Sequence, residues 1–176
     1  MTDALLEVRD AIHRLLLRDL RATQREIEAY VDDETLWRVV PGITNPGGTH
    51  ALHIAGNLRY FLGTVLCNGS YVRDREHEFS ARGLTRAEVS TEVVRTMQQV
   101  TQTLSTINVA QLQAPYPIKV LDVQLRTDAF LMHLAVHLGY HLGQLDYHRR
   151  IVSGDPTTMN TMGTMALIAQ LPSASP

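Results

Sequence analysis

Apolar side chains recur at three- and four-residue steps in four long segments, and this spacing places them on one side of a helix. We predict helices over residues 3–30, 49–66, 85–107 and 123–152. Thr49 is the expected N-cap of the second helix, and the Gly154-Asp155-Pro156 triplet stops the fourth. Between them we expect irregular loops over 71–83 and 110–120, with a short extended piece at 116–121.

Four helices of similar length without a strand pattern predict an all-α protein, folded as a four-helix bundle over residues 1–156. The two connections of about a dozen residues are long for simple helical hairpins. They permit an order other than strict up-down-up-down. Residues 157–176 are rich in Thr, Met, Ser and Pro. We expect them to form a partly ordered tail with one helical turn at 165–169.

Composition limits the classes of function. The chain has 176 residues, of which 44% are hydrophobic and 19% charged, and this balance is typical of one globular domain. The formal charge is −2 and the basic residues are dispersed, which argues against nucleic acid as a partner. Without an 18-residue apolar stretch or a signal peptide, we expect no membrane span and a cytoplasmic location. The single cysteine, Cys67, excludes an intramolecular disulfide and is expected to be a buried thiol.

Three histidines, His133, His137 and His141, follow one another at four-residue steps in the fourth predicted helix. Residues four apart share a helix face, so two such imidazoles can hold one metal ion. All three cannot, because the rise from His133 to His141 is about 12 Å and a metal–nitrogen bond is only about 2.0–2.1 Å. The pair is therefore either His133 with His137 or His137 with His141.

The second predicted helix carries His50 and His53, and either could supply a third ligand. His53 lies deeper in the helix and is the better candidate. Three histidines with an open position are typical of a reactive metal site. Asn57, four residues after His53, could hydrogen-bond a bound water. The competing interpretation is a set of satisfied core histidines. The remaining histidines, His13, His77 and His148, are expected at the surface or an edge, although His148 could line the same groove.

Gly139 and Gly143 lie inside the fourth predicted helix. Each costs about 1 kcal/mol relative to alanine in a helix interior. A pair four residues apart therefore indicates close approach by a neighbouring helix or by another subunit.

Two motifs resemble those of a known family. They are His53-Ile-Ala-Gly-Asn57 and His137-x-x-x-His141-x-Gly143-Gln144. Together and in this order they are similar to the DinB-like superfamily, also called the DinB/YfiT-like metalloenzymes. The resemblance implies a bundle with up-down-down-up order, many members being homodimers. It also implies a divalent metal, zinc or nickel with iron as a further option, held by His53, His137 and His141, which leaves His133 outside the ligand set.

The better-understood relatives in that superfamily are transferases and isomerases that use low-molecular-weight thiols. By resemblance we expect a metal-dependent thiol S-transferase or hydrolase that acts on a small molecule. Asn57 or Tyr140 would orient the fourth metal ligand. The alternative is a non-enzymatic helical dimer in which the metal is structural. A structural site would be closed by a fourth protein ligand, such as His50 or a carboxylate.

Overall fold

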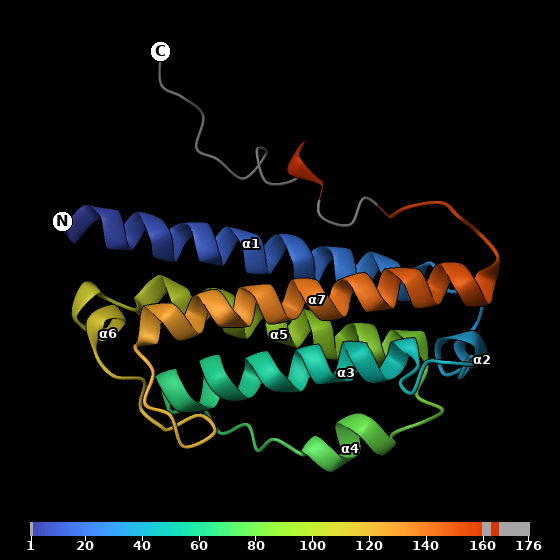
Figure 1. Cartoon of the computed structure of the whole chain (residues 1–176), viewed down its shortest axis with the longest axis horizontal. Helices are drawn as coiled ribbons and strands as arrows, with labels where there is room; N and C mark the ends of the chain where they lie inside the picture. The colour runs from blue at the N-terminus through green and yellow to red at the C-terminus, as the bar shows by residue number, and fades with distance from the viewer. Residues whose placement is uncertain (1, 160–162, 166–176) are drawn as a thin grey trace.

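The chain is mostly helical in a computed structural model that describes residues 2–159 and 163–165 (Figure 1). Four elements are long: α1 (Thr2–Glu28), α3 (Gly47–Leu58) with its π-helical continuation η1 (Arg59–Leu66), α5 (Arg86–Thr106) and α7 (Thr127–Ser153). Short helices α2 (Asp33–Leu36), α4 (Arg75–Ser80) and α6 (Val109–Gln113) lie in the connections. Over the described ranges there is no strand, only two isolated bridge pairs. The predicted all-α class is confirmed.

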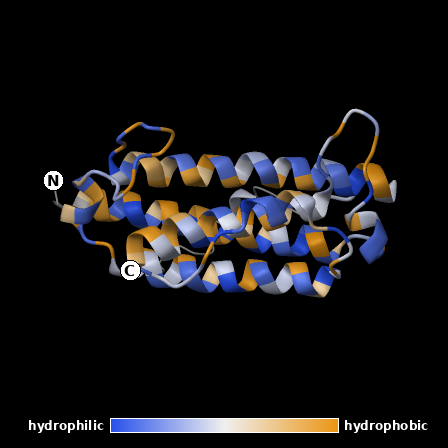
Figure 2. Cartoon of the chain, turned by 90° about the horizontal axis from the view of Figure 1, so that it is seen from below, coloured by the Kyte–Doolittle hydropathy of each residue, from blue (hydrophilic) through white to orange (hydrophobic). Residues whose placement is uncertain are grey.

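The long helices lie side by side. Helices α1 and α3 each pack against both α5 and α7. Helices α1 and α7 run in one direction along the molecule, and α3 and α5 run in the other (Figure 1). Apolar and polar residues alternate around each long helix (Figure 2), and their apolar sides form one buried core that includes Leu16, Leu58, Val93 and Leu138.

Helix ends differ from the predicted ones for local reasons. Helix α7 begins at Thr127 rather than at residue 123, because Leu121 and Asp122 take positive φ angles of 50° and 63° and turn the chain back. It ends where predicted, with Gly154 in the left-handed conformation at φ 68°. Helix α3 begins two residues before the predicted N-cap, after Pro46. Thr49 is therefore a buried residue inside the helix.

The prediction of an irregular loop over residues 71–83 is wrong, because α4 lies within it. Asp74 caps this helix by accepting a hydrogen bond from the backbone N–H of His77. Its only buried residue is Glu78, so no apolar periodicity could reveal it. Helix α6 likewise occupies part of the predicted loop over 110–120. The predicted turn at 165–169 lies outside the described residues, apart from its first residue.

Two smaller expectations, on the glycine pair and on Cys67, are also corrected. Within the described part of the chain, a Cβ atom on Gly139 would meet only Asp19 Oδ2, at 3.9 Å, and one on Gly143 would meet no atom within 4 Å. The expected approach of a neighbouring helix is therefore not found there, and the alternative of another subunit stays a prediction. Cys67 is half-buried rather than buried. In the described chain no helix is long and apolar enough to cross a membrane.

A buried polar network joins α1 to the C-terminal part of α7. The Arg149 side chain is completely buried, and its Nε donates to Glu26 Oε2 at 2.5 Å. His148 is also buried, contrary to the prediction that it lies at the surface. Its Nε2 donates to the carbonyl oxygen of Arg38 at 2.7 Å, and its Nδ1 accepts from the Tyr30 hydroxyl at 2.7 Å. The network thus connects Glu26, Tyr30 and Arg38 to the last turns of α7.

We predict that Glu26→Gln destabilises the fold by about 3–5 kcal/mol, because it removes the nearer charged partner of the buried Arg149 guanidinium. Only Asp146, 3.7 Å away, then faces this charge. Urea denaturation followed by circular dichroism measures this free energy of unfolding. The matched control is Glu28→Gln, an exposed carboxylate on the same helix, where we expect a change within about 0.5 kcal/mol. Equal effects from both substitutions would contradict the assigned role of the ion pair.

Candidate metal centre

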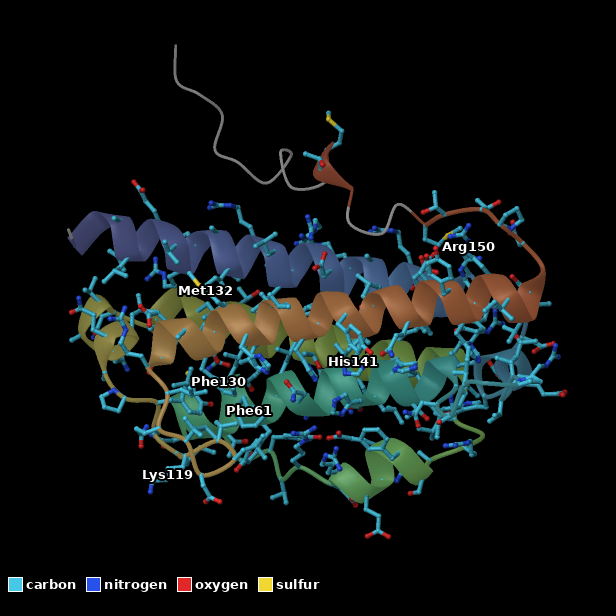
Figure 3. All side chains as sticks on the ribbon, viewed as in Figure 1. Phe61, Lys119, Phe130, Met132, His141 and Arg150 are labelled. Carbon is cyan, nitrogen blue, oxygen red and sulfur yellow. The ribbon has the colours of Figure 1, made fainter. Side chains whose placement is uncertain are left out.

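Three histidines from two helices meet at the interface between α3 and α7. His53 comes from α3, and His137 and His141 come from successive turns of α7. One ligand nitrogen from each lies within 4.8 Å of the others, and no other group of three or more His, Cys, Asp or Glu in the described part of the chain converges in this way. His141 is seen between α7 and α3 in Figure 3. The structure thus brings together the three residues that the family resemblance implied.

The two histidines of α7 present the same nitrogen to each other. Nε2 of His137 lies 3.2 Å from Nε2 of His141. Two nitrogens bound to one tetrahedral metal at about 2.0–2.1 Å would be about 3.3 Å apart. The pair is therefore already spaced for a shared ion. Of the two pairs that the spacing on α7 allowed, His137 with His141 is the pair that converges with His53.

His53 is oriented from behind by a carboxylate. Its Nδ1 donates to Glu78 Oε2 at 2.9 Å, which leaves Nε2 free to face α7. Arg73 holds the same carboxylate through two hydrogen bonds, Nε to Oε1 at 2.7 Å and Nη2 to Oε2 at 2.8 Å. A carboxylate behind a ligating imidazole fixes its tautomer and increases its basicity as a ligand.

Gly56 makes this carboxylate contact sterically feasible. A Cβ atom at position 56 would lie 2.1 Å from Glu78 Oε1, well inside van der Waals contact. The glycine, three residues after His53 on α3, therefore leaves the space in which Glu78 reaches the imidazole.

His141 is oriented in a similar way. Its Nδ1 donates to Gln144 Oε1 at 2.7 Å, one turn further along α7. Nδ1 of the buried His50 lies 3.3 Å from the same nitrogen. His50 therefore lies behind His141, on the side away from His137. It does not belong to the converging group of three.

Three histidines at this interface, His50, His137 and His141, favour the neutral form. Burial, followed by repulsion from His141 and His53, lowers the pKa of His137 to about 4. Burial and the neighbouring His141 lower the pKa of His50 to about 4 as well. Burial also lowers the pKa of His141. At neutral pH these imidazoles are uncharged, which is the form that binds metal.

Glu78 keeps its charge, because for this residue hydrogen bonds outweigh the effect of burial. Burial raises the pKa of this carboxyl, but hydrogen bonds from Arg73 and His53 outweigh burial and lower the pKa below its ordinary value. Glu78 is therefore an ionised carboxylate behind His53 at neutral pH.

The two predicted catalytic residues lie in different surroundings. Asn57 is only 8% exposed, and its Oδ1 atom is buried with no hydrogen-bond partner among the residues that the structure describes. A buried acceptor of this kind normally has a partner, so Asn57 is available to a bound molecule. Tyr140 is 64% exposed, and its ring meets His141 edge-on at 5.3 Å between centroids. The catalytic roles of both residues stay predictions.

The other histidines lie outside the ligand group. His133 is exposed, and its ring stacks on Phe130 at 5.8 Å between centroids, in keeping with its expected place outside the ligand set. His77 is exposed on α4 as predicted. His13 is half-buried on α1, and its Nε2 atom is buried with no hydrogen-bond partner within the described ranges.

Sequence reasoning missed Glu78 and Arg73. They belong to a charged stretch that offers no helical periodicity, and Glu78 is 25 residues from His53. The one local signal was Gly56, a glycine inside a helix next to a candidate ligand. A cavity of about 510 Å³ between α3, α4 and α5 also reaches Glu78, but it is lined by none of the three histidines. It is separate from the metal centre.

Comparison with known proteins adds no assignment. No family model matches the chain, and no curated protein matches it.

We predict that the metal-free protein becomes less stable as the pH falls below about 6.5, the ordinary pKa of histidine. His137 has a lower pKa in the folded chain than in the unfolded chain. In this pH range the unfolded chain therefore binds more protons, and acid favours unfolding. Melting temperatures measured with chelator between pH 7.5 and 5 test this directly.

In the same experiment His137→Gln should reduce the slope of the profile in part, because His50 and His141, whose pKa values are also lowered, still contribute. His77→Gln, at an exposed histidine, should leave it unchanged. If His137→Gln leaves the slope of the profile intact, His137 is not the source of the pH dependence.

Proposed function

We propose that this protein is a divalent-metal-dependent enzyme of the DinB-like superfamily, folded as a four-helix bundle with up-down-down-up order. The observation that carries the proposal is the convergence of His53, His137 and His141, with two of the facing nitrogens 3.2 Å apart. The side-by-side packing of the four long helices, two running in each direction (Figure 1), supports the bundle. The ion would be zinc or nickel, with iron as a further option, because imidazole suits all three.

The proposed chemistry is thiol-dependent S-transfer or hydrolysis on a small molecule. A divalent ion held by the three histidines would lower the pKa of a bound thiol or water. The side chains around the ion would orient its ligands and the bound molecule. Glu78 and Gln144 fix the orientation of the ligating imidazoles. Asn57 Oδ1 accepts a hydrogen bond from the bound molecule, and Tyr140 shields the outer edge of His141.

The alternative is a structural metal in a non-enzymatic protein, and it needs a fourth protein ligand. The nearest candidates are His50 and Glu78. His50 lies next to Nδ1 of His141, and Glu78 lies next to Nδ1 of His53. In both ligands this is the nitrogen that would not bind the ion. In those positions they support the ligands without joining them. This arrangement favours the enzyme, whose fourth position is left for substrate.

The proposal places the enzyme in the cytoplasm, where low-molecular-weight thiols are kept reduced. It also includes a homodimer. A row of exposed apolar side chains on α7 supports this assembly: Met132, Val136, Tyr140, Tyr147 and Ile151. We propose that α7 of a second copy packs against this row. Gly143 lies within the row and has no atom within 4 Å of its Cβ position, so a partner helix can approach closely there.

We predict one divalent ion per chain. His137→Ala should reduce metal affinity by at least 100-fold, because two histidines cannot replace three. His133→Ala, one turn earlier on the same helix and exposed, is the matched control and should retain full metal content. Metal analysis after chelation and reloading with zinc or nickel provides the measurement. Equal retention by both variants would contradict the ligand set.

The reloaded protein is then tested for thiol transfer to several electrophiles and for hydrolysis of ester and amide substrates. Asn57→Ala should retain the metal and lose most of the activity. His53→Ala distinguishes the alternative, because loss of a structural metal strongly lowers the melting temperature. Under the enzyme proposal the metal is lost while the fold holds. Full metal loading without any such reaction, together with a large loss of stability in His53→Ala, would support the structural metal.

We predict a dimer in solution at micromolar concentration. Val136→Glu should shift it towards monomer, because the substitution places a charge within the apolar row on α7. Val72→Glu, at an exposed valine outside the helices, is the control. Sedimentation equilibrium measures the change, and a monomeric unmodified protein would rule out the dimer.

A further inference from the structure

Arg73 lies at the edge of the metal centre and is held firmly. It lies in the connection between η1 and α4, and its side chain is only 13% exposed. Nε and Nη2 both bind the carboxylate of Glu78, and Nη2 also lies 3.3 Å from Nδ1 of His53. One side of the guanidinium is therefore fully occupied by the support of His53.

The third nitrogen of this guanidinium is available. Nη1 of Arg73 has no hydrogen-bond partner among the described residues, although Nε and Nη2 are both bonded. Arginine presents five N–H donors in a rigid plane, and a fork that binds one carboxylate at one side can bind a second anion at the other. The guanidinium also lies close to α7, because it contacts His53, whose ring centroid is 5.2 Å from that of His137.

The surroundings of Arg73 combine three kinds of contact. The Arg73 guanidinium carbon lies 5.8 Å from the centroid of the Phe61 ring. His53, Asn57 and Phe61 follow one another at four-residue steps along α3 and η1, and Phe61 packs edge-on against Phe130 of α7 at 5.0 Å. Next to the histidines there are thus an unused donor on Arg73, the unused acceptor on Asn57 and an apolar aromatic surface.

We propose that Nη1 of Arg73 anchors the carboxylate of a small organic acid whose thiol or other reactive group reaches the ion held by His53, His137 and His141. This inference rests on the proposed function and names its substrate class, a carboxylate-bearing small molecule with a short apolar chain. The short chain would lie against Phe61. A neutral molecule of the same shape lacks the group that Arg73 recognises.

The test uses the full chain loaded with cobalt(II), whose thiolate charge-transfer absorption reports thiol binding directly. The probes are 3-mercaptopropionate and its neutral methyl ester. We expect the acid to bind the unmodified protein about tenfold more tightly than the ester, which is the usual worth of one charge-assisted hydrogen bond. A preference below about twofold would overturn the proposal.

Variants identify the residue responsible for the preference. Arg73→Gln should remove the preference, and Arg73→Lys, which keeps the charge but loses the fork, should retain part of it. The control is Arg75→Gln, which removes an arginine that stacks on Phe79 instead, and it should keep the full preference. Because the ratio of the two probes is compared between proteins, intrinsic differences between the thiols cancel.

Failure of this inference is distinguishable from failure of the proposed function. If the unmodified protein binds no cobalt, both are overturned. If it binds cobalt and both thiols equally well, the metal site stands and the anchoring role is wrong. If Arg73→Gln weakens both probes by the same factor, Arg73 acts only through Glu78 and His53, and the anchoring role is again wrong.

Discussion

The packing of three imidazole rings between α3 and α7 is the constraint on which the rest of the centre depends. The rings of His53, His137 and His141 lie with centroids 4.5–5.2 Å apart. The outer nitrogens of His53 and His141 have partners in Glu78 and Gln144. The inner nitrogens of His137 and His141 face each other at 3.2 Å. Two nitrogen lone pairs at this distance repel unless a proton or a cation lies between them. In the metal-free protein a neutral His137 can supply that proton as Nε2–H, and a bound metal ion would take its place.

The fold around this interface is adapted to the cluster at the backbone level. Gly56 leaves the space for Glu78, and α3 passes into the π-helical η1 immediately after the turn that carries Asn57. π-helical turns are rare and occur frequently at functional sites. Side chains from elsewhere bind the carbonyl groups of η1: the Tyr116 hydroxyl donates to Phe61, and the Thr103 hydroxyl donates to Leu62. These bonds fix the aromatic surface next to the histidines.

The sequence predicted the long elements well because their signal is local. Apolar periodicity located all four long helices, and Gly154 marked the end of α7. Histidine spacing on α7 also limited the ligand pair to two choices. The short helices and the supporting residues could not be found in this way. Helix α4 has a single buried residue, and that residue is charged. His148 resembled a surface histidine because its partners, Tyr30 and Arg38, are more than 100 residues away.

Charge balance explains why the fourth position of the proposed site would favour an anion. Without metal, the ionised Glu78 and Arg73 cancel, and the imidazoles with resolved pKa shifts favour the neutral form. A divalent ion held by neutral ligands would bring two positive charges into a partly buried place, and an uncompensated buried charge is costly. Glu78 could offset this charge by binding the metal itself, which would close the site. The two hydrogen bonds from Arg73 oppose that movement by holding the carboxylate behind His53. In the proposed site, the open position and the preference for an anionic ligand would therefore have the same origin, the two hydrogen bonds by which Arg73 holds Glu78.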